Sequence, residues 1–176
     1  MNLSNELFYN YFSNRIDKNM YIKQLGIQED AFLQYLFGEI DNVVKDKKTE
    51  RLEYLLHALF IWDDVINNQS ELVKYIDTIN NLLLMDWHNQ HENLVNLIQK
   101  ISHESSLNYL EKAIGMKFVY MEWDDNYSFE KKCIRAIFYI GKKESISILK
   151  RVMESDIEEI SNLAERELKK LNYEND

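Results

Sequence analysis

Apolar residues recur at intervals of three and four positions along most of the chain, a spacing that places them on one face of an α-helix. The positions between them are largely polar or charged, as on the solvent-facing side of amphipathic helices. This pattern predicts about eight or nine helices, near residues 4–15, 28–46, 49–66, 70–84, 88–101, 106–114, 125–141, 143–153 and 157–171.

One apolar pattern occurs twice near the C-terminal end. Its first copy is Phe129, Cys133, Ile137 and Ile140, and its second copy, 31 positions later, is Ile160, Ala164, Leu168 and Leu171. A fixed period of this size indicates a stack of helical repeats, in which each unit buries its apolar face against its neighbours. Such stacks mostly serve as extended binding surfaces.

The composition favours an all-α protein in one domain. Proline is absent from the 176 residues and glycine occurs only four times, so few positions interrupt a helix. The single cysteine, Cys133, excludes a disulfide framework within the chain. No secretory signal follows Met1, and no uncharged apolar run approaches the length of a membrane span. We therefore expect a soluble cytoplasmic protein.

Charge is unevenly distributed along the chain. The net charge is −9, and residues 51–130 carry thirteen acids against five bases. The next segment, 131–151, carries seven bases and a single acid, Glu144. Net acidity disfavours nucleic acid as a partner, whereas an acidic band attracts basic proteins and speeds their encounter. The alternative is a solvated acidic face that only keeps the protein in solution.

Several short segments resemble HEAT-type repeats. They are Ile134-Arg135-Ala136-Ile137 ending in Ile140-Gly141, then Ser145-Ile146-Ser147-Ile148-Leu149, and a closing helix with Ala164 and Leu168. The resemblance implies an all-α, HEAT-like α-solenoid: a right-handed stack of antiparallel helix pairs in a single domain, 1–176. In this arrangement, irregular helices occupy 1–48, HEAT-like pairs occupy 49–171, and 172–176 form a flexible tail.

A narrower resemblance covers about residues 87–171. Its motifs are Trp87-His88-x-x-His91-Glu92, Tyr120-x-x-x-Asp124-Asp125-x-Tyr127 and Lys132-Cys133-Ile134-x-Ala136. Together they resemble small bacterial HEAT-type proteins that are encoded beside polymorphic or contact-dependent toxins. The resemblance implies an immunity protein, which binds its toxin and is not an enzyme.

All three tryptophans stand beside acidic residues near predicted helix ends. Aromatic anchors surrounded by carboxylates suit a basic protein partner, because Trp buries a large area while Asp pairs with Lys or Arg. The alternative places the tryptophans in the core and uses the aspartates as helix caps. The predicted partner-binding residues are Trp62, Asp63, Asp64, Asp86, Trp87, Tyr120, Glu122, Trp123, Asp124, Asp125 and Tyr127.

Candidate chemistry is sparse. His88, His91 and Glu92 have a spacing that could hold zinc, with His103 downstream, but packing and hydrogen bonding explain them better. Cys133 occupies an apolar stripe, where a small core residue is expected rather than a reactive thiol. The sequence lacks a nucleophile elbow and a phosphate loop. We predict no catalytic residue, no cofactor and no bound metal.

Three functional hypotheses follow. The first is an immunity protein that occludes the active site of a basic, nuclease-like toxin through its acidic, Trp-containing surface. The second is a general HEAT-type adaptor without a toxin partner, for which the basic segment 131–151 could be the contact. The third, less favoured, is a metal-dependent enzyme that uses His88 and His91 or Asp124 and Asp125. We expect neither nucleic acid nor a membrane as partner.

Overall fold

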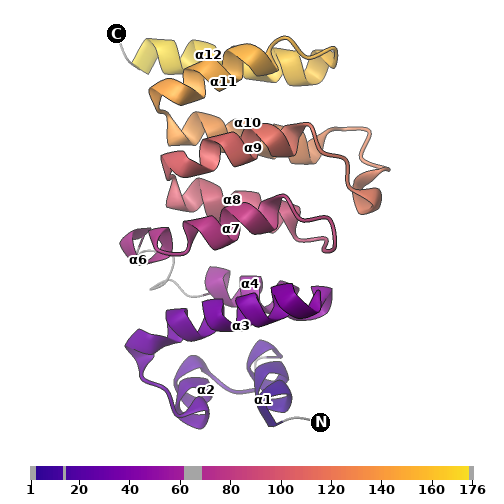
Figure 1. Cartoon of the computed structure of the whole chain (residues 1–176). Coiled ribbons are helices and arrows are strands. Elements are labelled where there is room, and N and C mark those ends of the chain that lie inside the picture. The colour runs from indigo at the N-terminus through magenta and orange to yellow at the C-terminus, as the bar shows by residue number, and fades with distance from the viewer. Residues whose placement is uncertain (1–2, 14, 62–68, 175–176) are drawn as a thin grey trace. The chain divides into compact units, whose positions relative to one another are not determined.

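The computed structural model describes residues 3–13, 15–61 and 69–174, and within these ranges every regular element is a helix (Figure 1). The predicted all-α class is therefore confirmed for the described residues. No helix in these ranges is long and apolar enough to cross a bilayer. Contacts divide the chain into two compact units, Met1–Val65 and Ile66–Asp176. The single domain remains a prediction.

Unit 1 contains two pairs of helices. Helix α1 (Leu3–Phe12) contacts α2 (Lys18–Leu25), and α3 (Phe32–Asp46), preceded by the short helix η1 (Glu29–Ala31), contacts α4 (Thr49–Ile61). Tyr21 of α2 is fully buried between two aromatic rings, stacked on Tyr11 at 4.7 Å and edge-on to Phe32 at 5.9 Å. The leucines of α4 supply much of the remaining core, at Leu52, Leu55, Leu56 and Leu59.

Helix α2 was not predicted from the apolar pattern. Its signals lie at its ends: the Asp17 carboxylate accepts a hydrogen bond from the Met20 backbone N–H at 2.8 Å, and Gly26 ends the helix at φ 69°. An Asp at the N-cap and a left-handed glycine after the last turn are common helix boundaries.

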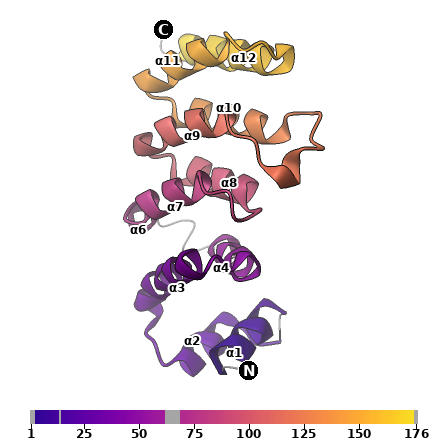
Figure 2. The same cartoon turned by 45° about the vertical axis from the view of Figure 1, so that its right-hand side comes forward.

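Unit 2 consists of helices that pack in two layers (Figures 1 and 2). One layer holds α7 (Ile76–Leu83), α9 (Leu107–Ile114) and α11 (Lys143–Val152), and the other holds α8 (His91–Ile101), α10 (Ser128–Ile140) and α12 (Glu158–Glu174). Helices contact their neighbours within each layer, and α7 contacts α8, α9 contacts α10, and α11 contacts both α10 and α12 across the layers. The shorter elements are α6 (Gln69–Val73), η2 (Glu104–Ser106) and η3 (Val119–Met121).

The repeated apolar pattern forms the core between these helices. All eight of its residues are buried, in α10 and in α12. Helix α10 contacts α8, α9, α11 and α12, so helices of both layers cover it. Gly141 ends α10 at φ 62°, as its position after the last apolar residue predicts.

Several predicted boundaries in unit 2 differ from the structure, three of them in a way that has a visible cause or a large effect. The helix expected over 70–84 is two helices, α6 and α7, separated by a turn at Lys74 and Tyr75. The helix expected from 88 begins at His91, because the His88 ring accepts a hydrogen bond from the Gln90 backbone N–H and holds that segment in a loop. The last helix continues to Glu174, beyond the predicted end at 171.

Candidate functional site

Two loops lie at the same end of the helices in unit 2. The first, Leu84–Gln90, joins α7 to α8, and the second, Gly115–Tyr127, joins α9 to α10 (Figure 1). We call these two loops together the loop edge. It brings together eight of the predicted partner-binding residues: Asp86, Trp87, Tyr120, Glu122, Trp123, Asp124, Asp125 and Tyr127. The other three, Trp62, Asp63 and Asp64, lie outside the described residues.

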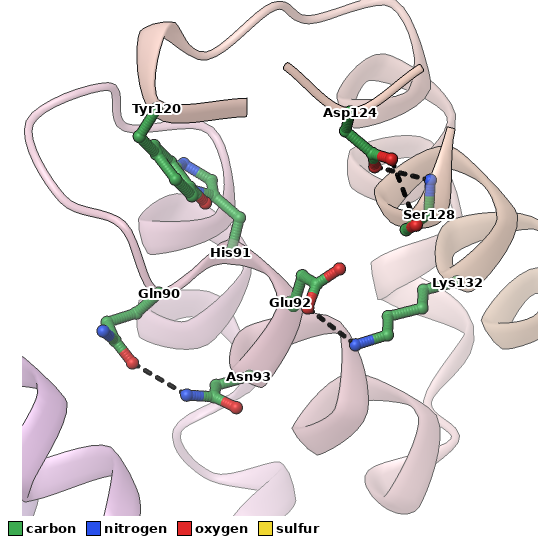
Figure 3. Close-up of polar contacts among 8 residues, drawn as sticks. All are labelled: Gln90, His91, Glu92, Asn93, Tyr120, Asp124, Ser128 and Lys132. Atoms are coloured by element: carbon green, nitrogen blue, oxygen red, sulfur yellow. Dashed lines mark hydrogen bonds and ion pairs between the residues drawn. The ribbon is translucent and has the colours of Figure 1, made fainter. Parts of the chain in front are cut away.

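His91 joins the two loops. Its Nε2 lies 2.8 Å from the Met85 carbonyl oxygen of the first loop. Its Nδ1 lies 2.7 Å from the hydroxyl of Tyr120 in the second loop, and Figure 3 shows these two side chains. Because a carbonyl oxygen only accepts, Nε2 carries the proton and Nδ1 accepts from the Tyr120 O–H. One buried imidazole thus positions the segment that carries Tyr120 and Trp123.

An aromatic cluster surrounds this hydrogen bond. The His91 ring lies 3.6 Å from the Phe118 ring, 4.3 Å from the His88 ring and 6.0 Å, edge-on, from Phe129, measured between centroids. Phe118 and Phe129 also meet edge-on at 5.5 Å, and both are buried. Such packed rings restrain the second loop beyond what area burial alone provides. The role of Phe118 could not be predicted from the sequence, because a single aromatic residue in a loop has no periodicity.

Burial keeps these rings neutral near pH 7. Desolvation, reinforced by the neighbouring His88, lowers the pKa of His91 to about 4. Desolvation also lowers the pKa of His88, although its Nε2 donates to the Leu82 carbonyl at 2.9 Å. Burial raises the pKa of Tyr120 to about 12, so its hydroxyl keeps its proton and remains a donor.

The histidine pair is occupied by hydrogen bonds on all four ring nitrogens. His88 bonds Leu82 and the Gln90 backbone, and His91 bonds Met85 and Tyr120. A metal ion needs a free imidazole lone pair. In the described part of the chain, no three His, Cys, Asp or Glu side chains are grouped as metal ligands. The geometry thus favours the packing interpretation of His88 and His91 over the zinc interpretation.

The second loop exposes large apolar side chains. Trp123 is 92% exposed, Val119 80% and Tyr120 43%. Trp87 on the first loop is half-buried, with its indole N–H 3.3 Å from the Met85 sulfur. Tryptophan side chains are usually largely buried, and an exposed one contributes no apolar burial to the stability of the fold. The alternative that places the tryptophans in the core is therefore wrong for Trp123.

The acidic residues of the loop edge have two different roles. Asp86, Glu122 and Asp125 are exposed. Asp124 instead accepts hydrogen bonds from the Ser128 backbone N–H at 2.6 Å and the Ser128 hydroxyl at 3.2 Å (Figure 3). It also accepts one from the Asn126 backbone N–H at 3.1 Å. Partial burial raises the pKa of Asp124, but these hydrogen bonds together outweigh it and lower the pKa overall. The alternative that uses the aspartates as helix caps therefore holds for Asp124, which caps α10.

A cavity of about 280 Å³ opens beside the second loop. Its aromatic walls are Phe118, Tyr127 and Phe129, and its acidic lining includes Glu122 and Asp125 together with Glu130 of α10. The residues that complete the lining are Met116, Lys117, Met121 and Asp124. Desolvation raises the pKa of the half-buried Glu130 despite the opposing charges of Lys117 and Lys131. Glu130 was not among the predicted partner-binding residues.

Below the loops, α8 and α10 are joined by an ion pair, with Lys132 Nζ 2.8 Å from a Glu92 oxygen (Figure 3). At the start of α8, Gln90 of the first loop accepts a hydrogen bond from the Asn93 side chain at 2.8 Å (Figure 3). Cys133 is fully buried, and burial raises the pKa of its thiol well above the ordinary value. Glu92 and Cys133 therefore support the helices rather than supply a reactive group.

Comparison of the chain with family models, with curated proteins and with solved structures found no match in any of the three. The interpretation of the loop edge therefore depends on its own geometry.

Proposed function

We propose that this chain is a non-enzymatic binding protein, built as a HEAT-like α-solenoid, which neutralises a basic bacterial toxin as its immunity partner. The observation that carries the proposal is Trp123, which is 92% exposed on a loop held in place by packed aromatic rings. Rigid, exposed aromatic side chains are typical anchors of protein interfaces.

Charge on the loop edge supports a cationic partner. The exposed carboxylates of Asp86, Glu122 and Asp125 stand on the same two loops as Trp87 and Trp123. Complementary charge steers the encounter of two proteins, and the aromatic side chains then supply the desolvated centre of the interface. If the toxin is a nuclease, the carboxylates would occupy the place of the nucleic-acid backbone and so occlude its active site.

The cavity beside Phe118 and Glu130 suits a Lys or Arg side chain of the partner. Its carboxylates favour a positive charge, and the partly buried Tyr127 offers aromatic surface beside them. The hydrogen bond between His91 and Tyr120 fixes the loop before binding, which reduces the entropy lost when the complex forms.

The non-enzymatic part of the proposal is supported by the residues that could otherwise react. The rings of His88 and His91 are held by hydrogen bonds, the Asp124 carboxylate caps a helix, and Cys133 is buried. Among these four residues, no nucleophile is therefore paired with a general base.

The test is a binding measurement with the purified product of the adjacent gene, in a catalytically inactive form if it proves to be a toxin. We expect co-purification and a calorimetric affinity that Trp123→Ala weakens by about 2 kcal/mol or more. The matched control is Tyr139→Ala on α10, which removes an aromatic side chain that is 59% exposed away from the loop edge. Absence of binding at low salt, or equal losses in both variants, would contradict the proposal.

A further inference from the structure

A groove of about 370 Å³ lies between α10 and α12, away from the loop edge. Its lining contains three cations, Lys131 and Arg135 of α10 and Arg166 of α12, against one carboxylate, Glu159. Asn162 and Leu163 complete the lining. In a chain with 30 acids and 21 bases, a groove with an excess of two positive charges is unexpected.

The cations of the groove are poorly neutralised by the protein. Lys131 and Arg135 form no ion pair within the described ranges 3–13, 15–61 and 69–174, although Lys131 influences Glu130 at longer range. Arg166 lies 3.4 Å from Glu167, but that buried carboxylate has a closer partner in Lys170 at 2.7 Å. Arg166 therefore keeps most of its five N–H donors for another acceptor.

The arrangement is unfavourable for the isolated fold. Lys131 and Arg135 are four residues apart on α10, and like charges at this spacing repel each other on a helix surface. The packing of α12 against α10 adds Arg166 to the same groove. A bound anion would remove this repulsion, because each cation would then face a negative charge.

We propose that the α10–α12 groove binds a phosphate group of a small phosphorylated ligand. A phosphate monoester carries about −1.5 to −2 charges at neutral pH and offers three acceptor oxygens, which matches three cationic side chains. A single carboxylate has one charge and two oxygens, and leaves one cation unpaired. The net charge of −9 disfavours a nucleic-acid polymer.

This proposal is independent of the loop edge and its partner. The experiment is a titration of the full ¹⁵N-labelled chain with inorganic phosphate, in which ionic strength is kept constant with sodium chloride. We expect saturable shifts that centre on Lys131, Arg135, Asn162 and Arg166. The paired change Lys131→Gln and Arg135→Gln should weaken binding by about tenfold or more, because two of the three cations are lost.

The matched control is Lys150→Gln, which removes an exposed cation of α11 that does not line the groove. It should leave the phosphate affinity unchanged. The paired variant should fold normally, because neither side chain makes an ion pair in the described ranges, and its circular dichroism verifies this. Shifts that do not saturate, or that persist in the paired variant, would mean an adventitious ion only and overturn the proposal.

Two further titrations identify the source of the anion. Sodium acetate, at the same ionic strength, should bind more weakly than phosphate, and an equal or tighter affinity for acetate would overturn the choice of phosphate. A twelve-nucleotide single strand with a terminal phosphate should bind only slightly more tightly than inorganic phosphate. Binding of this strand that tightens strongly with its length would overturn the small ligand in favour of nucleic acid.

Discussion

The buried imidazole of His91 should make unit 2 sensitive to mild acid. The ordinary pKa of histidine, 6.5, applies to the unfolded chain, whereas burial lowers the pKa of His91 to about 4 in the folded chain. Between these values the unfolded state binds more protons, so stability is complete above pH 6.5 and falls as pH decreases towards 4. Because of this linkage, the free energy of unfolding falls by about 2 kcal/mol between pH 7 and pH 5, and by roughly 3 kcal/mol in total by pH 4.

The measurement is urea unfolding followed by circular dichroism at pH 7 and pH 5. His88, whose pKa burial also lowers, adds to the loss in the same direction. In the variant His91→Gln the titrating group is absent, so the free energy of unfolding should change less between the two pH values than in the parent chain. The comparison concerns this change with pH and remains valid if the variant is less stable at both values.

A ring-proton NMR titration of the parent chain tests the same reasoning without a substitution. The His91 signal should remain that of a neutral imidazole down to about pH 4. Titration of His91 near pH 6.5, together with equal stability at pH 7 and pH 5, would refute the claim that burial and the Met85 and Tyr120 contacts hold this ring neutral.

Three other predictions concern stability and reactivity. Tyr120→Phe leaves the buried Nδ1 of His91 without its donor and should lower the free energy of unfolding by about 1–2 kcal/mol in urea at pH 7; no change would mean that water replaces the hydroxyl. Asp124→Ala removes the cap of α10 and should cost about 1 kcal/mol, whereas Asp125→Ala should change the thermal-unfolding stability by less than about 0.5 kcal/mol. Cys133 should be inert to a disulfide reagent in the native chain and react in urea; rapid native labelling would contradict its burial.

The helices of unit 2 could be predicted because burial follows the apolar period. The stripe from Phe129 to Ile140 is set by side-chain spacing alone, and the structure buries all of it. Helix α2 offers no such stripe, since its buried residues are only Tyr21 and Ile22, and it depends on its end residues and on aromatic contacts with other helices. A helix of this kind has no apolar period from which the sequence could predict it.

The loop edge could be predicted in composition but not in geometry. Acidic residues beside tryptophan are visible in the sequence, whereas the His91–Tyr120 hydrogen bond joins positions 29 residues apart and depends on how two loops fold. Asp124 and Asp125 are adjacent residues of the same type, so the sequence does not distinguish their roles. In the structure, Asp124 accepts a hydrogen bond from the backbone N–H of Ser128, which follows Tyr127 with its positive φ of 53°. Backbone conformation separates a helix cap from an exposed charge.

In the proposed function, the exposed carboxylates of the loop edge guide a cationic protein onto Trp123. Stopped-flow measurement of association with the product of the adjacent gene tests this proposal, using the paired change Glu122→Lys and Asp125→Lys. The control is Glu104→Lys, an exposed acid on η2 in the connection between α8 and α9, outside the loop edge.

We expect the paired change to slow association by about tenfold or more at low salt, the difference to shrink as salt is added, and the control to have little effect. An association rate that the paired change leaves unaltered, or that the control lowers equally, would contradict the proposal.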